Sequence, residues 1–140
     1  AQLTVLTYRD FQYKSLYSRG EIDLVWGSPP CTEYSIARAS AKKPRDLKGA
    51  DELVQITKEI AKYYRVHCAL GNPQSGLLKT REVVKDLPFT DTPYCQYGYL
   101  YRKHTRIWHS INDYLKLRPM CCSSNPCDIF KALRRHKKSA

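Results

Sequence analysis

The sequence predicts an α/β domain in which helices flank a mostly parallel β-sheet. Two short apolar runs, at residues 22–26 and 66–70, have the β-branched and aromatic composition that is typical of strands. Between them, the apolar residues at positions 51–64 recur at helical spacing. Strand, helix and strand in this order form a crossover unit, and such units build parallel sheets with right-handed connections.

Two strands are predicted in the first part of the chain. The run LTVLTY at residues 3–8 and the run IDLVW at residues 22–26 are short and rich in β-branched and aromatic side chains. The second run is closed by Gly27, Pro29 and Pro30, which favour a loop. We therefore expect each run to be a strand that ends abruptly.

The helix predicted at residues 51–64 is amphipathic. Asp51 and Glu52 lie in its first turn, where negative charge is favourable against the helix dipole. One face of this helix carries the apolar residues Leu53, Ile56, Ile60, Tyr63 and Tyr64. That face should pack on the sheet.

The next strand is predicted at residues 66–70 (VHCAL), and the loop GNPQSG at residues 71–76 ends it. In open α/β sheets, ligands bind outside the carboxyl ends of the strands. The loops that begin at Gly27 and Gly71 both follow such ends, so we expect them to face one crevice. Beyond residue 81 the sequence favours a short helix at 80–86, a strand at 105–111 and a basic helix at 127–138.

The charge of the chain points to a polyanionic partner. Lys and Arg number 24 against 13 Asp and Glu, which gives a net charge of +11. Such an excess favours nucleic acid, because binding to phosphates releases condensed counterions; the alternative is a basic surface that only aids solubility. No apolar run approaches the about 20 residues that span a bilayer, and residues 1–10 do not form a signal peptide, so no membrane is expected.

Six cysteines are present, yet the chain is longer than most disulfide scaffolds, which favours a reducing intracellular compartment. The cysteines are then free, reactive or bound to metal. A tetrahedral zinc site has candidate ligands near the C-terminus, with buried free cysteines as the commoner alternative. The candidates are Cys95, Cys121, Cys122, Cys127 and His136, with Cys122 and Cys127 separated by four residues.

Cys31 directly follows Pro29 and Pro30 at the end of a predicted strand. Two prolines fix the backbone, so the sulfur can be presented as a nucleophile with little loss of entropy. The alternative is a packed cysteine beside a turn. A phosphatase loop is disfavoured, because it would need an arginine where Ala37 stands.

Three ordered stretches resemble the cytosine-specific DNA methyltransferases that modify carbon 5 of the base, particularly their phage and viral branch. The stretch DLVWGSPPCTEYSIA (residues 23–37) is similar to the family's strand and Pro-Cys loop. GNPQSGLLKTR (71–81) is similar to its Glu-Asn-Pro loop, and YCQYGYLYRKHTRIW (94–108) to its Gln-x-Arg-x-Arg element. The resemblance implies an incomplete Rossmann-like methyltransferase sheet.

The resemblance also implies a mechanism. The target cytosine is flipped out of DNA, a cysteine attacks carbon 6, and carbon 5 takes a methyl group from S-adenosylmethionine. The nucleophile is then Cys31, and Arg106 matches the arginine that holds the base and the cysteine. The substrate-binding residues implied are Pro30, Asn72, Pro73, Arg102 and His104, of which the last two replace the family's glutamine and first arginine.

Gly71 stands where the family has a glutamate that contacts the base and supports protonation. General acid–base help of this kind contributes about 10²–10⁴-fold, so methyl transfer should be impaired. Glu33 is not a replacement, because this branch carries acidic residues there in any case. With His104 in place of the family's first arginine, the forked guanidinium geometry is also lost.

The family's Gly-x-Gly cofactor loop does not occur in the sequence, which starts about where the family's third strand is expected. The chain is then a fragment, half of a split enzyme whose partner supplies the cofactor site, or a decayed relative. We expect a catalytic-loop part at residues 1–115 and a Cys-rich, basic segment at 116–140. The alternatives to an impaired methyltransferase are a non-catalytic nucleic-acid-binding or assembly module and a zinc-stabilised interaction domain.

Overall fold

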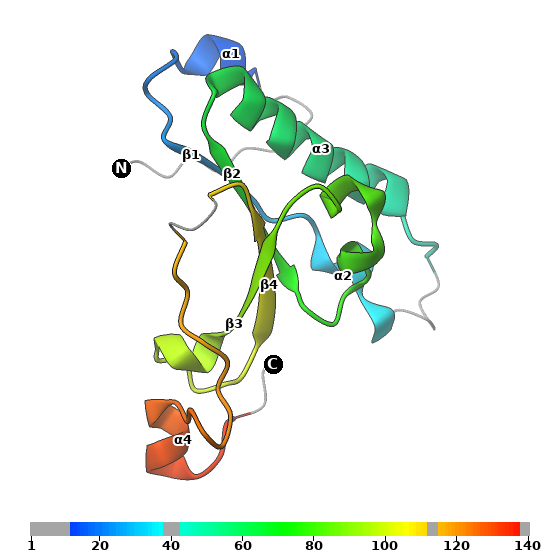
Figure 1. Cartoon of the computed structure of the whole chain (residues 1–140). Coiled ribbons are helices and arrows are strands. Elements are labelled where there is room, and N and C mark those ends of the chain that lie inside the picture. The colour runs from blue at the N-terminus through cyan, green and yellow to red at the C-terminus, as the bar shows by residue number, and fades with distance from the viewer. Residues whose placement is uncertain (1–11, 38–42, 112–114, 138–140) are drawn as a thin grey trace.

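The computed structural model describes residues 12–37, 43–111 and 115–137 (Figure 1). The strand expected at residues 3–8 lies outside them. The strands are β1 (Leu24–Gly27), β2 (His67–Pro73), β3 (Phe89–Pro93) and β4 (His104–His109). The α-helices are α1 (Tyr13–Leu16), α2 (Cys31–Tyr34), α3 (Leu47–Tyr64) and α4 (Asp128–Leu133), and the 3₁₀ turns are η3 (Leu77–Thr80), η4 (Glu82–Val84) and η5 (Tyr94–Tyr97).

The four strands form one mixed sheet in the order β1-β2-β4-β3. β1 and β2 are parallel, as the crossover through α3 requires, whereas β2 with β4 and β3 with β4 are antiparallel. The predicted α/β class is confirmed, but the prediction of a mostly parallel sheet is wrong for the described strands. The reason is the connection at residues 94–103, which is shorter than the dozen or so residues that a parallel crossover needs.

The predicted elements are found with shifted ends. α3 begins before residue 51, because the Asp46 side chain caps it by accepting a hydrogen bond from the Gly49 amide at 2.8 Å. β2 extends past residue 70 into the first half of the predicted loop and ends at Pro73. The helix predicted at 80–86 is a pair of 3₁₀ turns, and the basic helix predicted at 127–138 ends at Leu133, followed by Arg134 in the left-handed region.

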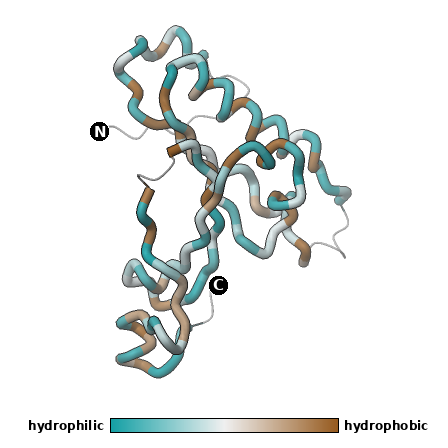
Figure 2. Tube along the Cα trace, viewed as in Figure 1, coloured by the Kyte–Doolittle hydropathy of each residue, from teal (hydrophilic) through white to brown (hydrophobic). Residues whose placement is uncertain are grey.

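α3 covers one face of the sheet (Figure 1). Figure 2 shows polar and apolar residues alternating along this helix, as expected for a helix with one buried side. The core between α3, the sheet and η3–η4 consists of Tyr34, Ala50, Val54, Leu70, Leu78, Val84 and Trp108. A second, smaller cluster at the far end of the molecule consists of Cys95, Cys121 and Cys127, with Ile129 and Phe130 packed against it.

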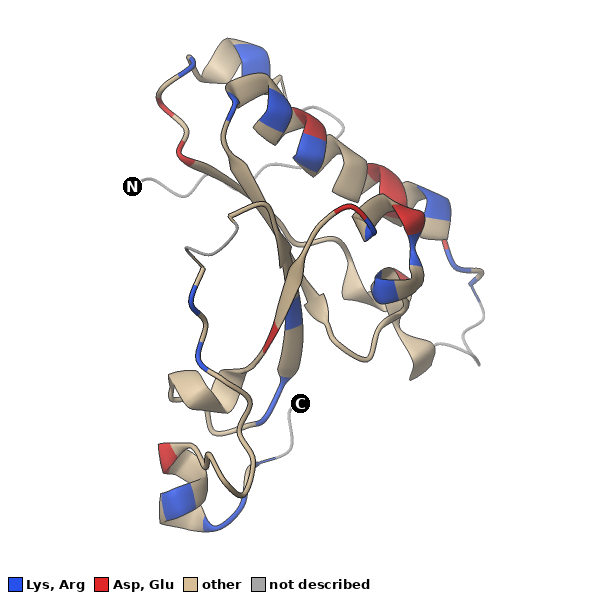
Figure 3. Ribbon diagram, viewed as in Figure 1, with Lys and Arg blue, Asp and Glu red and all other residues tan. Residues whose placement is uncertain are grey.

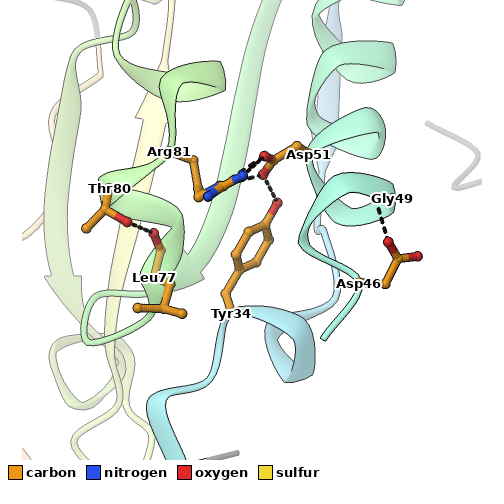
Figure 4. Close-up of polar contacts among 7 residues, drawn as sticks. All are labelled: Tyr34, Asp46, Gly49, Asp51, Leu77, Thr80 and Arg81. Atoms are coloured by element: carbon orange, nitrogen blue, oxygen red, sulfur yellow. Dashed lines mark hydrogen bonds and ion pairs between the residues drawn. The ribbon is translucent and has the colours of Figure 1, made fainter. Parts of the chain in front are cut away.

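Asp51 of α3 joins the segments that follow β1 and β2 (Figure 4). Its Oδ1 accepts a hydrogen bond from the Tyr34 hydroxyl at 2.9 Å, and its Oδ2 accepts from Nη2 of Arg81 at 2.7 Å. Burial, then the hydrogen bond to Asp51, raises the pKa of Tyr34. The Tyr34 hydroxyl is therefore a permanent donor, and one carboxylate holds α2 and the η3–η4 segment against α3.

None of the helices in these three described ranges has the length and apolar composition that crossing a bilayer would require.

Replacing Asp51 by alanine should lower the free energy of unfolding by about 2–3 kcal/mol, because a buried hydroxyl and a half-buried guanidinium lose their acceptor. Urea denaturation monitored by circular dichroism measures the change. Glu52→Ala is the matched control, since Glu52 is the neighbouring acidic residue of α3 and is exposed. Equal losses in the two variants would show that Asp51 does not connect the segments.

Stability should fall on acidification through the pKa of unfolded histidine. His109 is 4% exposed, and burial lowers its pKa, so near pH 6 the unfolded chain binds more protons than the folded one. The free energy of unfolding then rises with pH over this range. Urea unfolding at pH 5.5 and 7.5 should give a smaller difference for His109→Gln than for the wild type, and an equal difference would show that His109 does not cause the pH dependence.

Candidate active site

The loop after β1 and the loop after β2 lie together, as the parallel pairing of the two strands dictates. Asn72, which is 3% exposed, donates from Nδ2 to the Pro29 carbonyl oxygen at 3.0 Å. Pro29 thus lies against the end of β2. The two sequence stretches that predicted a shared crevice are joined by a direct hydrogen bond.

A cavity of about 610 Å³ lies at these loops, within the about 300–1,000 Å³ that is usual for small-ligand sites. Alternation along the paired strands places it on the sheet face opposite α3. It is lined by Trp26 and Ser28–Cys31 of the first loop and Gly71–Pro73 of the second. The remaining walls come from Thr92, Tyr94, Tyr97, Tyr99, Lys103, Thr105, Ile107 and Leu117.

Cys31 is the first residue of α2 and is exposed at this cavity. Pro30 precedes it in the extended region, with φ −60° and ψ 110°. Three residues later, Tyr34 is fully buried and bound to Asp51, which anchors the other end of α2. The sulfur is therefore carried on a short segment that is fixed on both sides.

Glu33 does not line the cavity. Its Oε2 accepts a hydrogen bond from the Asp46 amide at 2.7 Å, at the start of α3. Glu33 thus stabilises the α2–α3 connection.

Two polar side chains where β2 and β4 are paired are buried and incompletely bonded. Oδ1 of Asn72 and Oγ1 of Thr105 have no hydrogen-bond partner among the described residues. A buried polar atom without a partner costs about 1–3 kcal/mol, so such atoms are uncommon away from binding sites. Of the two, Thr105 is on the cavity face of the sheet, whereas Asn72 pairs with Arg106 on the other face and its Oδ1 lies beside Gly76.

Aromatic rings form the wall contributed by η5 and the segment after it. The rings of Tyr94, Tyr99 and Tyr101 lie 5.2–6.1 Å apart, centre to centre. Tyr97 and Tyr99 are 44% and 50% exposed, and Nζ of Lys103 lies 5.5 Å from the Tyr94 ring centre. This wall can stack with a flat aromatic ligand.

Arg106 lies on the other face of the sheet. It pairs with Asn72 across β2 and β4, and its neighbours in sequence, Thr105 and Ile107, are the residues that line the cavity. Its guanidinium donates to both carboxylate oxygens of Asp91, at 2.7 and 2.8 Å, and lies 3.7 Å from the Phe89 ring centre. The structure therefore does not bring Arg106 together with Cys31.

Arg102 and His104 do not line the Cys31 cavity either. They border a second cavity of about 560 Å³, together with Gln74 and Ser75. Arg102 donates from Nη2 to the Cys121 carbonyl oxygen at 3.0 Å, whereas burial, and then the Arg102 charge, lowers the pKa of His104. Sequence reasoning missed Lys103 and Thr105, which strict alternation about Arg106 would have identified.

A comparison with curated proteins found the probable DNA (cytosine-5)-methyltransferase of Frog virus 3 (isolate Goorha), which is 30% identical over 115 residues. The resemblance to the cytosine-specific DNA methyltransferase family is confirmed. The match covers 74% of this chain and 51% of the viral protein, so the chain spans about half the length of that relative. No family model matches the sequence.

Trp26 crowds Gly71, the position at which the resemblance predicts a glutamate in the family. A Cβ atom on Gly71 would lie 2.8 Å from Cζ2 of Trp26, closer than real Cβ contacts. The indole Nε1 donates to Oγ of Ser28 at 2.8 Å, which fixes the ring beside the Pro-Cys loop. The indole therefore occupies the space in which a glutamate side chain would begin.

S-adenosylmethionine, the methyl donor of the family, does not fit the Cys31 cavity as the described residues form it. The donor carries a sulfonium, an ammonium and ribose hydroxyls, which call for carboxylate acceptors. No Asp or Glu lines this cavity in the described part of the chain, and its charged residue is the cation Lys103. The cavity suits a neutral or anionic aromatic ligand better.

Acidic residues are few in the half of the molecule that contains β3, β4 and α4, so this half carries a net positive charge (Figure 3). Over the described residues from Phe89 to Lys137, the acidic side chains are Asp91, which pairs with Arg106, and Asp128, which pairs with Lys131. Against them stand the basic residues Arg102, Lys103, Arg106, Lys116, Arg118, Lys131, Arg134, Arg135 and Lys137.

The predicted zinc ligands are partly brought together. Cys95, Cys127 and His136 form a cluster with Cys121, in which the candidate ligand atoms all lie within 4.8 Å of one another. Cys122 is exposed, and its sulfur lies 3.1 Å from Oγ of Ser124. Of the two adjacent cysteines, Cys121 therefore faces the cluster.

Gly71→Ala should lower the free energy of unfolding by about 1–3 kcal/mol in the wild type, because the new methyl group collides with the indole of Trp26. In a Trp26→Ala background the same change should have little effect. Urea unfolding of the two single variants and the double variant measures this coupling. An equal cost of Gly71→Ala in both backgrounds would show that the indole does not fill the glutamate position.

Proposed function

We propose that this chain forms the nucleophile and base-binding part of a DNA (cytosine-5-)-methyltransferase. The observation that carries the proposal is the exposed Cys31 thiol at a cavity that is also lined by tyrosine rings and by the incompletely bonded Thr105 hydroxyl. The viral relative supports the same class of chemistry.

The proposed step of this chain is the addition of the Cys31 thiolate to carbon 6 of cytosine. A sulfur–carbon bond forms, and the electron pair of the 5,6 double bond moves to carbon 5, which becomes nucleophilic. The fixed Pro29–Pro30 backbone limits the motion of the sulfur and so favours attack at one carbon. S-adenosylmethionine supplies the methyl group in the family, and we propose that a second chain or another segment provides its site.

The base is proposed to enter the cavity after flipping out of the duplex. Its faces would stack against the rings of Tyr97 and Tyr99, which are exposed. The Thr105 hydroxyl would donate a hydrogen bond to the polar edge of the base, and Asn72 would hold the Cys31 loop in place through its hydrogen bond to Pro29. Lys103 would stabilise negative charge on the ring, a task that the family gives to other residues.

Arg106 is proposed to position the site rather than to touch the base. Its bidentate pair with Asp91 ties β3 to β4, and β4 carries Thr105 and Ile107 to the cavity. Arg102 and His104, beside Gln74 and Ser75 in the second cavity, are proposed to contact DNA phosphates next to the flipped base. The basic residues from Arg102 to Lys137 would extend that contact.

A second candidate function is a DNA-binding module without chemistry. It is favoured by Gly71 and Trp26, because the group that supports protonation in the family is replaced by an indole. Such a module would bind DNA through its basic half with steep salt dependence, and neither S-adenosylmethionine nor Cys31→Ser would change its affinity.

Hydrogen exchange at carbon 5 of cytosine tests the proposed step without the methyl donor. Reversible addition of Cys31 makes carbon 5 basic, so a solvent deuteron is taken up there, and loss of the original proton with release of the thiolate leaves deuterated cytosine. Full-length chain incubated with a cytosine-containing DNA oligonucleotide in D₂O should deuterate the base, as measured by mass spectrometry. Cys31→Ser should lower the rate by about 10²-fold or more.

Cys122→Ser is the matched control, because Cys122 is the other exposed cysteine and lies outside the cavity. It should exchange like the wild type. Retained DNA binding without exchange in the wild type would favour the module without chemistry. With a cofactor-binding chain supplied, DNA containing 5-fluorocytosine should form a covalent adduct with the wild type and none with Cys31→Ser; equal behaviour would exclude Cys31 as the nucleophile.

A further inference from the structure

The four-residue cluster in the C-terminal half has the composition of a structural metal site. We propose that Cys95, Cys121, Cys127 and His136 bind one zinc ion, which fastens the C-terminal segment to the wall of the Cys31 cavity. Three thiols and one imidazole form a Cys₃His set, one of the usual donor sets of tetrahedral structural zinc. The inference does not depend on the methyltransferase proposal, because it rests on other residues.

The distances fit a tetrahedral ion. With zinc–sulfur bonds of about 2.3 Å and zinc–nitrogen bonds of about 2.0 Å, neighbouring ligand atoms lie about 3.5–3.8 Å apart. Nε2 of His136 lies 3.8 Å from Sγ of Cys121 and 3.2 Å from Sγ of Cys127. Since all four atoms lie within 4.8 Å of one another, shifts of about 1 Å or less complete the site.

The surroundings of the ligands are those of metal-bound thiolates. The Cys127 amide points at Sγ of Cys121 at 3.4 Å, and the Phe130 amide points at Sγ of Cys127 at 3.3 Å. Such N–H···S contacts hold ligand sulfurs in place and offset their charge. The Phe130 ring stacks on the His136 imidazole, with centres 5.4 Å apart, and fixes the plane of that ligand.

Charge balance also supports a metal. Three thiolates around a divalent cation leave one net negative charge, which must be offset where the sulfurs are buried. Arg102 reaches the Cys121 carbonyl oxygen at 3.0 Å, and α4 is followed directly by Arg134 and Arg135. This basic half can therefore accommodate a site of net charge −1.

The C-terminal segment is held by hydrogen bonds to β3, η5 and the segment after η5, but it has little apolar packing of its own. Residues 115–127 contain no helix or strand, and α4 is six residues long with no fully buried side chain. The buried core at this end consists of Cys95, Cys121 and Cys127 themselves, and units this small usually need a staple. A zinc ion would replace the missing apolar core.

The ion would also shape the Cys31 cavity. Cys95 lies in η5, and the first and last residues of η5, Tyr94 and Tyr97, line that cavity. The Tyr97 hydroxyl accepts a hydrogen bond at 2.8 Å from the amide of Arg118, three residues before Cys121. Fixing Cys95 to Cys121 therefore fixes the tyrosine wall.

Metal analysis tests the inference on the full chain. Protein purified without chelator from zinc-supplemented cells should contain about one zinc per chain by mass spectrometry of the elements. Replacing zinc by cobalt(II) should give the visible absorption of a tetrahedral ion and a thiolate charge-transfer band. Cys121→Ser should lose most of the metal, whereas Cys122→Ser should keep it, because these adjacent cysteines face in different directions.

Cys121→Ser alone would be uninformative if the chain failed to fold, so zinc release from the wild type provides an independent measurement. A mercurial reagent that blocks thiols should release about one zinc per folded chain to a chromogenic chelator. A folded wild-type chain without stoichiometric zinc would overturn the proposal. So would equal metal loss in Cys121→Ser and Cys122→Ser, or a disulfide among Cys95, Cys121 and Cys127 in the intact mass.

Discussion

The carboxylate of Asp51 is the contact on which the arrangement of the candidate active site depends. Tyr34 ends the helix that begins with Cys31, and Arg81 ends the stretch that begins with Gly71. Both bind Asp51, so the two loops of the cavity are held to the same point of α3. Two helical turns farther along, Lys58 pairs with Asp86 at 2.7 Å and secures the η3–η4 segment a second time.

The position of Asp51 suits this role energetically. The side chains of Asp51 and Arg81 are 22% and 34% exposed, so the pair is screened less than a surface ion pair but keeps access to water. The buried Tyr34 hydroxyl needs a hydrogen-bond acceptor in any case. The Asp51 carboxylate accepts from both this hydroxyl and the Arg81 guanidinium. A single residue thereby avoids two unpaired groups and aligns the loops that carry Cys31 and Asn72.

The local pattern of residues was enough to predict β1, α3, β2 and the meeting of the loops at their ends. It was not enough for β3, because FTDTP has little apolar content and its strand character comes from pairing with β4. The direction of β4 also depends on tertiary pairing, which a single apolar run does not encode. The sequence pattern therefore predicted more parallel strand pairing than the sheet contains.

The candidate site shows the same division between local and tertiary information. Cys31 was recognised as a candidate nucleophile from its neighbours in sequence, since two prolines and a strand end are local features. Arg106 was assigned from the resemblance to the family's Gln-x-Arg-x-Arg element, whereas its partner Asp91 lies fifteen residues away and holds it on the face opposite the cavity. A shift of one residue along a strand moves a side chain to the other face of the sheet. A motif match that does not fix the strand pairing therefore cannot tell whether Arg106 or Thr105 faces the cavity.

Cys121 and Cys122 illustrate why a ligand set is harder to predict than a single nucleophile. Neighbouring residues in an irregular segment can point anywhere, and the choice between them is made by Arg102, which binds the Cys121 carbonyl oxygen, and by the Cys127 amide, which meets the Cys121 sulfur. Neither contact has a signature in the sequence.

Gly71 and Trp26 link the question of chemistry to that of packing. A glycine at position 71 without a neighbouring ring would leave a void beside the Pro-Cys loop, and voids of that kind are costly. Here the indole fills the space and bonds to Ser28, so the loop that carries Cys31 remains ordered without the carboxylate. The order of the Cys31 loop therefore does not require a carboxylate at position 71. In this chain the indole of Trp26 provides that order.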